Sequence, residues 1–278
     1  MESTETSIAE LRGVAHELRM LVVKTVHHAA NGHIGGSLSE VDILSALFFR
    51  IMNIDPDDAN KSDRDRFILS KGHCTPGYYS TLARRGFFPV EELGHFDELG
   101  SRLQGHPDMH KTPGVDISSG SLGQGLSCGI GMALGNKADG SGFTTFVLMG
   151  DGELQEGQVW EAVLYAGAHR LPQLVAIVDC NGVQLSARTN DIMALEPLEA
   201  KWEAFGWTVL TCDGHDMTDL VKTLERAKNA STDGPVAVIA HTVKGKGVSF
   251  MEGKHEWHGK APNDEEFRAA MAELEGSA

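Results

Sequence analysis

Two short polar segments, each directly after an apolar run typical of a buried strand, hold the residues best suited to metal-ion chemistry. The first contains Gly150, Asp151 and Gly152, and the second contains Asn181. A carboxylate and an amide oxygen are hard ligands of the kind that Mg²⁺ and Ca²⁺ prefer. The glycines allow the backbone to approach a phosphate closely, and the amides that open the following helix favour an anion. Together the two segments predict a metal-bridged diphosphate site.

The elements between these segments must bring them together. The apolar spacing predicts a strand before Asp151, a helix over residues 155–169 and a second strand over 174–178. In a right-handed parallel crossover, the C-terminal ends of both strands lie at one edge of the sheet, where open α/β sheets bind ligands. The first tripeptide alone is also typical of a turn in which Asp caps a helix. The second strand, ending at Asn181, favours the metal site.

Further apolar runs complete the predicted fold. Strands are expected at 66–70, 207–212 and 235–241, and helices at 7–30, 41–52, 76–85, 197–205, 217–230 and 262–278, with another beginning near 125. This alternation predicts an α/β fold with a doubly wound, mainly parallel sheet of about five or six strands and helices on both faces. We expect one domain over residues 1–278, in which 262–278 form a terminal helix.

Two of the helices have distinctive N-terminal residues. Ser37 and Glu40 have the spacing of a capping box, which predicts a helix from Val41 and leaves His33 in a glycine-rich loop over residues 31–37. The helix near residue 125 repeats glycine through its first turns. Each glycine costs roughly 1 kcal/mol relative to alanine in a helix, so close backbone packing or the approach of a ligand must offset it.

Composition excludes several classes of protein. The formal net charge is −15 over 278 residues and no basic run offsets it, which argues against binding to nucleic acid or to anionic membranes. The four cysteines form no CxxC pair, so we expect reduced thiols rather than disulfides or a zinc site. The polar N-terminus and the lack of a long apolar stretch predict neither targeting nor membrane insertion. A cytoplasmic protein is expected.

The motif GDG, followed some thirty residues later by Asn, resembles the thiamine diphosphate signature, and the text GDGELQEGQVWEA resembles transketolases in particular. The segments NGHIGGS, SKGH, GHP, SLGQG, TVKGKG and EWHG are similar to transketolase segments in the family's order, from about residue 10 to 262. The resemblance implies the thiamine diphosphate-binding fold, also called the PP domain. It also implies thiamine diphosphate with Mg²⁺, or Ca²⁺ or Mn²⁺ in its place. The metal ligands would be Asp151, Asn181 and the backbone carbonyl of Val183.

The same resemblance assigns roles to residues that spacing alone leaves open. A lone loop histidine is usually a solvated surface residue, but the family uses histidines at four of these places for proton transfer and for hydrogen bonds to the sugar. Ile34 stands where many members have proline. The implied catalytic residues are His33, His73, His106 and His258, with His255 a weaker candidate. The implied cofactor-binding residues are His73, Leu122, Gly123, Gln124, Gly150, Asp151, Gly152, Glu156, Asn181, Lys244 and His258.

The resemblance covers only the first domain of transketolases. In the family, the glutamate that activates the cofactor comes from a pyrimidine-binding domain, which we expect on a separate C-terminal transketolase subunit. The chain would then be inactive alone and form an α2β2 heterotetramer that transfers a two-carbon ketol unit between sugar phosphates. A subunit of a deoxyxylulose-phosphate synthase or of a 2-oxo acid dehydrogenase, and a non-catalytic cofactor-binding domain, stay open as alternatives. So do pentose phosphate, apulose phosphate and sulfonated sugars as donors.

Overall fold

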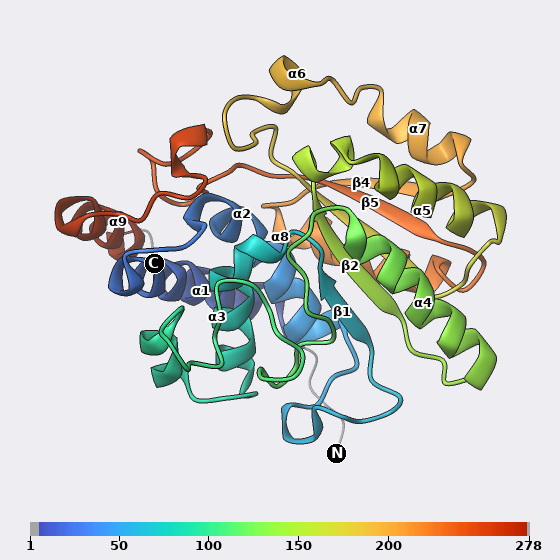
Figure 1. Ribbon diagram of the computed structural model, residues 1–278, viewed down its shortest axis with the longest axis horizontal. Coiled ribbons are helices and arrows are strands. Elements are labelled where there is room, and N and C mark those ends of the chain that lie inside the picture. Colours follow the sequence, from blue (N-terminus) through green and yellow to red (C-terminus); the bar gives the residue numbers. More distant parts are fainter. Residues whose placement is uncertain (1–5, 277–278) are drawn as a thin grey trace.

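Five parallel strands form the centre of the computed structural model, which describes residues 6–276 (Figure 1). Their order in the sheet is β1-β2-β3-β5-β4. The apolar run of each central strand is buried, as expected for a parallel sheet covered on both faces. The predicted doubly wound sheet is confirmed, and every pair of neighbouring strands is parallel. The strands are β1 (Arg66–Leu69), β2 (Thr145–Gly150), β3 (Leu174–Cys180), β4 (Thr208–Asp213) and β5 (Val236–His241).

Alternating side chains along each strand pack against two different helical layers (Figure 1). Phe146 and Leu148 pack toward α2 (Ile34–Ala46), α3 (Thr75–Arg85) and α8 (Met217–Ala230), which are backed by α1 (Ile8–Ala29). Val147 and Met149 pack toward α4 (Gln124–Asp139), α5 (Gly157–Ala168) and α7 (Leu198–Ala204). The short α6 (Thr189–Ile192) lies beyond β3, and α9 (Asp264–Gly276) packs on α1. Shorter helical turns span Leu47–Ile51, Pro56–Asp58, Gly72–Cys74, Val90–His95, Gly152–Gln155 and His255–Trp257.

The start of α2 differs from the expectation. The helix begins at Ile34 with His33 as the preceding residue, so the predicted loop over 31–37 and the capping box of Ser37 and Glu40 are wrong. The Ser37 hydroxyl instead donates to the carbonyl of His33 at 2.8 Å, and Glu40 is fully buried. Apolar packing explains the earlier start, because all thirteen residues of α2 are buried. A capping box does occur, at the N-terminus of α1.

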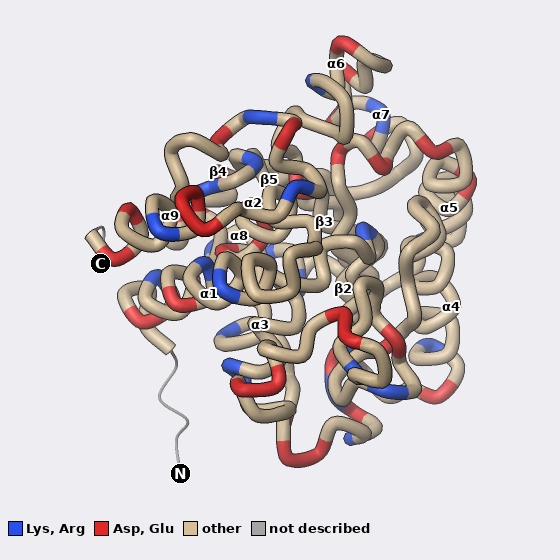
Figure 2. The backbone as a smooth tube through the Cα atoms, turned by 60° about the vertical axis from the view of Figure 1, so that its left-hand side comes forward, with Lys and Arg blue, Asp and Glu red and all other residues tan. Residues whose placement is uncertain are grey.

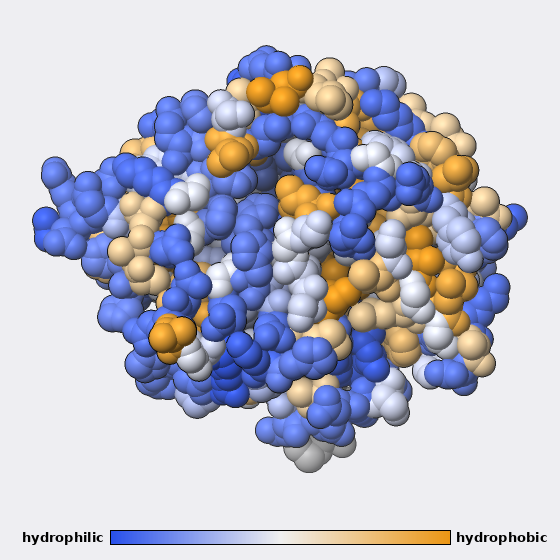
Figure 3. Space-filling model, viewed as in Figure 1, coloured by the Kyte–Doolittle hydropathy of each residue, from blue (hydrophilic) through white to orange (hydrophobic). Residues whose placement is uncertain are grey.

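Positions of basic and acidic residues are interspersed along the backbone, and the basic ones do not gather on one face (Figure 2). None of the helices in residues 6–276 is both long enough and apolar enough to cross a membrane. Exposed apolar side chains gather over α4 and α5, at the right of the view in Figure 3, where Leu134, Leu164 and Tyr165 reach solvent.

The glycines of α4 fall into two groups. A Cβ added to Gly129 would lie 2.6 Å from Cγ2 of Val147 in β2, and one on Gly125 would lie 2.3 Å from Ser70 Oγ. Gly131, two residues further on and exposed, has open space where a Cβ would stand, with no atom of another element within 4 Å. The expected close backbone packing therefore applies to the side of α4 that faces the sheet.

This difference gives a matched pair of substitutions. We expect Gly129→Ala to destabilise the protein by roughly 1–3 kcal/mol, because the added methyl group overpacks the contact with β2. Gly131→Ala should stabilise it by roughly 0.5–1 kcal/mol, because alanine is the better helix former and the site has room. Urea unfolding of both variants measures the difference, and equal midpoints would contradict this account of α4.

Candidate active site

A cavity of about 360 Å³ lies at the C-terminal edge of the sheet. Segments that follow β1, β2, β3 and β5 line it, together with the start of α2 and the loop between α3 and α4. Eleven of the residues proposed from the sequence therefore meet in one place, although they are spread over more than 220 positions. They are His33, His73, His106, Leu122, Gly150, Asp151, Gly152, Asn181, Val183, Lys244 and His258.

The carboxylate of Asp151 is held firmly at this edge. Its Oδ1 accepts from the backbone N–H of Gly152 at 2.8 Å, and its Oδ2 accepts from Gly182 N–H at 2.7 Å and from the Thr189 hydroxyl at 3.1 Å. Burial and, after it, the negative charge of Asp179 raise the pKa of Asp151 in spite of these hydrogen bonds. A bound cation would relieve both effects, so the carboxylate fits a metal ligand.

Asn181 and Val183 supply the other two oxygens proposed as ligands. Asn181 Oδ1 accepts from Val183 N–H at 3.1 Å, and the Val183 carbonyl accepts from Lys244 Nζ at 3.1 Å. Each of these oxygens has two lone pairs, so one remains for a metal ion. No group of three or more His, Cys, Asp or Glu in residues 6–276 is placed to hold a metal. The donor set with its single carboxylate thus suits Mg²⁺ whose remaining coordination positions are filled by an anion such as a diphosphate.

Three histidines that line the same cavity form a cluster. The ring centroids of His33 and His73 are 4.8 Å apart, those of His33 and His258 are 5.3 Å apart, and those of His73 and His258 are 5.1 Å apart. Burial lowers the pKa of His33 and, more strongly, that of His73, and neighbouring cationic groups add to the effect. The cluster is therefore neutral near pH 7. His106 is exposed at the cavity mouth, beside Gly120.

Lys244 links the histidine cluster to one of the oxygens proposed as metal ligands. Its Nζ lies 2.8 Å from His258 Nδ1 and is 3.1 Å from the Val183 carbonyl. Burial lowers the pKa of Lys244 to about 8, and burial together with Lys244 lowers that of His258 to about 3. At neutral pH the ammonium therefore donates to Nδ1, which leaves the proton of the His258 ring on Nε2.

Sequence reasoning missed Lys71, which lines the cavity floor. Its Nζ donates to Asp179 Oδ2 at 2.6 Å and to the Gly36 carbonyl at 3.1 Å, and it lies 2.9 Å from Glu40 Oε2. Burial works against the ammonium, but the charge of Asp179 leads the effects that outweigh it, and the pKa of Lys71 lies well above its ordinary range. The signal was present, because Lys71 follows β1 at the same sheet edge as Asp151.

Glu40 holds a proton next to this lysine. It is fully buried, and neither of its oxygens makes a hydrogen bond of good geometry among the described residues. Burial raises the pKa of Glu40 to about 8, while Lys71 keeps that of Asp179 low although burial alone would raise it. Lys71, ionised Asp179 and protonated Glu40 together carry no net charge, which is the arrangement that burial favours.

Four residues proposed from the sequence do not line the cavity. Gly123 lies behind it, where its N–H donates to Glu153 Oε1 at 2.8 Å. Gln124 and Glu156 are exposed at the start of α4 and before α5. His255 is also exposed and lies 3.5 Å from Glu256. Conversely, Gly36, Cys74, Gly120, Glu153, Gln184 and Leu185 line the cavity without having been proposed.

Comparisons with known proteins show which family this chain matches. Residues 11–276 match the family model of the transketolase thiamine diphosphate-binding domain. The chain is 44% identical over 266 residues to a 6-deoxy-6-sulfo-D-fructose transketolase subunit of Clostridium sp. (strain MSTE9), covering 96% of both chains. It is 45% identical over 256 residues to an apulose-4-phosphate transketolase subunit of Actinobacillus succinogenes, covering 92% of both.

Solved structures agree with this result. A Campylobacter jejuni transketolase superposes with a TM-score of 0.88 at 33% identity, over 97% of this chain and 43% of that one. A Pichia stipitis transketolase in complex with sedoheptulose 7-phosphate gives a TM-score of 0.90 at 30% identity, over 97% of this chain and 41% of that one. The chain thus spans about two fifths of the length of these solved transketolases.

The protonation of Glu40 gives a prediction about stability and pH. Because the folded protein raises this pKa from 4.5 to about 8, the stability that Glu40 contributes is complete below pH 4.5 and is lost as the pH rises through 8. Glu40→Gln keeps the neutral shape at every pH. Relative to wild type, its free energy of unfolding should therefore rise between pH 5 and pH 8.5, on the order of 1–3 kcal/mol.

Urea unfolding at several pH values measures this difference. Glu161→Gln, at an exposed position of α5, is the matched control and should follow the wild-type pH dependence. A constant difference between Glu40→Gln and wild type would show that Glu40 is ionised throughout this range.

Proposed function

The chain belongs to the transketolase family, whose thiamine diphosphate-binding domain it matches, and we propose that it is the cofactor- and metal-binding subunit of a two-subunit transketolase. The reaction is the transfer of a two-carbon ketol unit from a ketose phosphate to an aldose phosphate. The observation that carries this proposal is the meeting of Asp151, Asn181, Val183 and Lys244 with three neutral histidines in one cavity. Residues 1–278 would act as one domain with α9 at its end.

Asp151, Asn181 and the Val183 carbonyl would hold Mg²⁺ against the diphosphate of the cofactor. Lys244 contributes a positive charge beside the same carbonyl, and Gly150 and Gly152 keep side chains away from the approach of an anion. Lys71 is bound to two acidic residues and therefore fixes the cavity floor rather than adding free positive charge. Leu122 adds an apolar side chain to the cavity lining. Gly123, Gln124 and Glu156 would contribute from outside this cavity.

Bound thiamine diphosphate supplies the electron sink into which the C2–C3 bond of a ketose is cleaved. The histidines act on the sugar. Because burial keeps His33 and His73 neutral, each offers one N–H donor and one acceptor to sugar hydroxyl groups, and each is able to accept a proton transiently. His258 keeps its ring proton on Nε2 while Lys244 binds Nδ1, so Nε2–H is available as a donor. His106, exposed at the mouth, meets the incoming substrate first.

A partner subunit would complete the active site. Two relatives that this chain matches over more than nine tenths of their length are named as transketolase subunits. We infer a separate C-terminal subunit that carries the pyrimidine-binding domain and the activating glutamate, in an α2β2 heterotetramer. Glu156, which is exposed before α5, would contact such a partner. The four free cysteines suit a cytoplasmic setting, in which thiols stay reduced.

The first test is ketol transfer from xylulose 5-phosphate to ribose 5-phosphate with Mg²⁺ and thiamine diphosphate. We expect no turnover by this chain alone and turnover after it is mixed with the product of the adjacent gene, because the activating glutamate comes from the partner. Apulose 4-phosphate and 6-deoxy-6-sulfofructose serve as further donors. Turnover by the chain alone would contradict the two-subunit proposal, and cleavage of pyruvate in place of ketoses would indicate another thiamine-dependent enzyme.

The metal site has its own test. Asp151→Asn keeps the size of the side chain and removes its charge, so binding of thiamine diphosphate in the presence of Mg²⁺ should weaken by more than about tenfold. Tryptophan fluorescence of the complex with its partner measures this affinity. Asp191→Asn, at an exposed position of α6, is the matched control and should bind as wild type does. Equal affinities of the two variants would show that Asp151 is not a metal ligand.

A further inference from the structure

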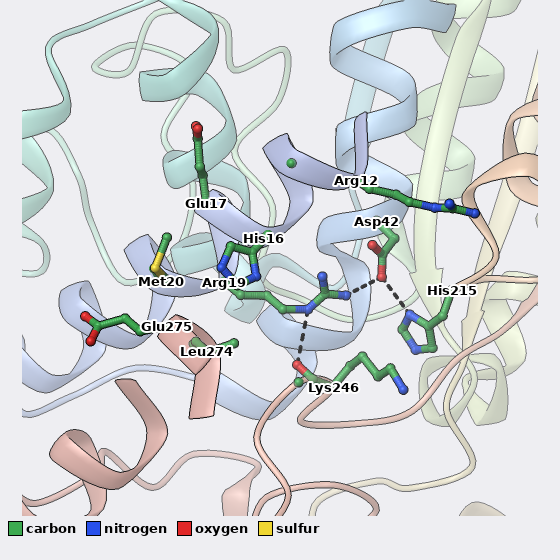
Figure 4. A pocket seen from close by; sticks show the side chains of 12 residues that line it. Arg12, His16, Glu17, Arg19, Met20, Asp42, His215, Lys246, Leu274 and Glu275 are labelled. Carbon is green, nitrogen blue, oxygen red and sulfur yellow. Dashed lines mark hydrogen bonds and ion pairs between the residues drawn. The ribbon is translucent and has the colours of Figure 1, made fainter. Parts of the chain in front are cut away.

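The segment over residues 242–247, which follows β5, brings Lys244 into the active-site cavity. On its other side lies a second and larger cavity of about 770 Å³, between α1, α2 and α9 (Figure 4). Lys246 and Gly247 line that second cavity, so the segment separates the two. Lys244 itself is only 2% exposed. The contacts that fix the backbone of this segment therefore determine the position of Lys244 Nζ.

Hydrogen bonds from other elements hold the segment at successive residues. Thr242 N–H donates to the Cys180 carbonyl at 3.2 Å, and Gly245 N–H donates to the Gly35 carbonyl at 2.9 Å. Two further bonds come from side chains. Val243 N–H donates to His215 Nε2 at 2.8 Å, and the Lys246 carbonyl accepts from Arg19 Nε at 3.3 Å. These two bonds lie on either side of Lys244.

Both side chains are held by one carboxylate, that of Asp42 in α2 (Figure 4). Asp42 Oδ2 accepts from His215 Nδ1 at 2.7 Å and also from Arg19 Nη2. Because His215 Nε2 accepts the Val243 N–H, its ring proton must be on Nδ1, where it donates to Asp42. Asp42 thereby selects the tautomer that is able to bind the segment. All three side chains are largely buried, with exposed fractions of 12% for Arg19 and His215 and 8% for Asp42.

We propose that Asp42, Arg19 and His215 are positioning residues that hold the 242–247 segment on both sides of Lys244 and so keep its ammonium in the active site. They do not line the active-site cavity and act only through the backbone of the segment. Their effect on catalysis rests on the proposed function, in which Lys244 stands beside the diphosphate and His258. Their effect on the position of Lys244 in the free chain does not depend on the proposed function.

A long, flexible lysine gains most from such support. Its side chain has four rotatable bonds, and holding it in one conformation costs up to about 2 kcal/mol of conformational entropy before any displacement of its backbone is counted. Its charge is also partly desolvated in the cavity. If the backbone on either side is released, Lys244 is free to turn toward solvent. Charge-assisted hydrogen bonds through Asp42 are strong enough to oppose this.

Chemical labelling of lysines in the free chain tests the proposal without cofactor, partner or turnover. An amine-reactive ester is added and each lysine is quantified by mass spectrometry. In His215→Phe, which removes both hydrogen bonds of the ring, labelling of Lys244 should rise about tenfold. The exposed Lys254 serves as reference, and Lys71, which is equally buried but held elsewhere, should stay protected. His215→Gln, which keeps an acceptor for Val243 N–H, should restore much of the protection.

Other outcomes overturn the proposal. Unchanged labelling of Lys244 in His215→Phe would show that His215 does not hold it. A rise at Lys71 as large as that at Lys244 would show a general loosening of the fold instead. His169→Phe is the matched control, since this exposed histidine also hydrogen-bonds to the backbone, there to the Tyr165 carbonyl, but lies at the end of α5.

A double-mutant cycle tests the consequence for the site. In the complex with the partner and Mg²⁺, His215→Phe should weaken thiamine diphosphate binding severalfold in the wild-type background and have no further effect beside Lys244→Ala. Equal effects in both backgrounds would show that His215 acts by another route. If the wild-type complex binds no thiamine diphosphate, the proposed function fails, while the labelling result still decides the positioning role.

Discussion

The rest of the site depends on the hydrogen bonds made by one buried carboxylate, that of Asp179 at the end of β3. It accepts hydrogen bonds from Ser39 in α2 at 2.6 Å, from Lys71 after β1 at 2.6 Å and from Asn181 at 3.2 Å, and also from the Thr242 hydroxyl after β5. Four segments far apart in the sequence are thus joined at one point. A charge this deeply buried is stable only when it is paired and fully hydrogen-bonded, so these segments have little freedom to separate.

Around this point the charges are arranged in two layers. Below, Lys71 is matched by Asp179 and protonated Glu40, so the floor is neutral and rigid. Above, Lys244 Nζ contacts the neutral His258 ring and the Val183 carbonyl, and its charge has no carboxylate within ion-pair distance in the described structure. An anion entering the cavity therefore meets one ammonium that no carboxylate in the described structure neutralises. Burial of both layers makes these interactions stronger than they would be in water.

Much of this could be predicted from the sequence because it depends on local pattern. The apolar runs before Asp151 and Asn181, and the helix between them, define a crossover whose two strand ends must meet. The parallel sheet, and the small residues of α4 that face it, follow from the same reasoning. The start of α2 could not be predicted in this way. Ser37 and Glu40 have the spacing of a cap, but their burial against α3, with Glu40 beside Lys71, outweighs that local preference.

The sequence by itself determined which residue types stand at the strand ends, and hence the kind of ligand that this edge of the sheet suits. Only the tertiary structure decided which of them share a cavity, and it left Gln124, Glu156 and His255 outside. It also revealed Lys71 with Glu40, and Asp42 with His215, pairs more than thirty and more than 170 positions apart. Such pairs leave no periodic signal, because their partners are chosen by the packing of whole elements and by the need to neutralise buried charge.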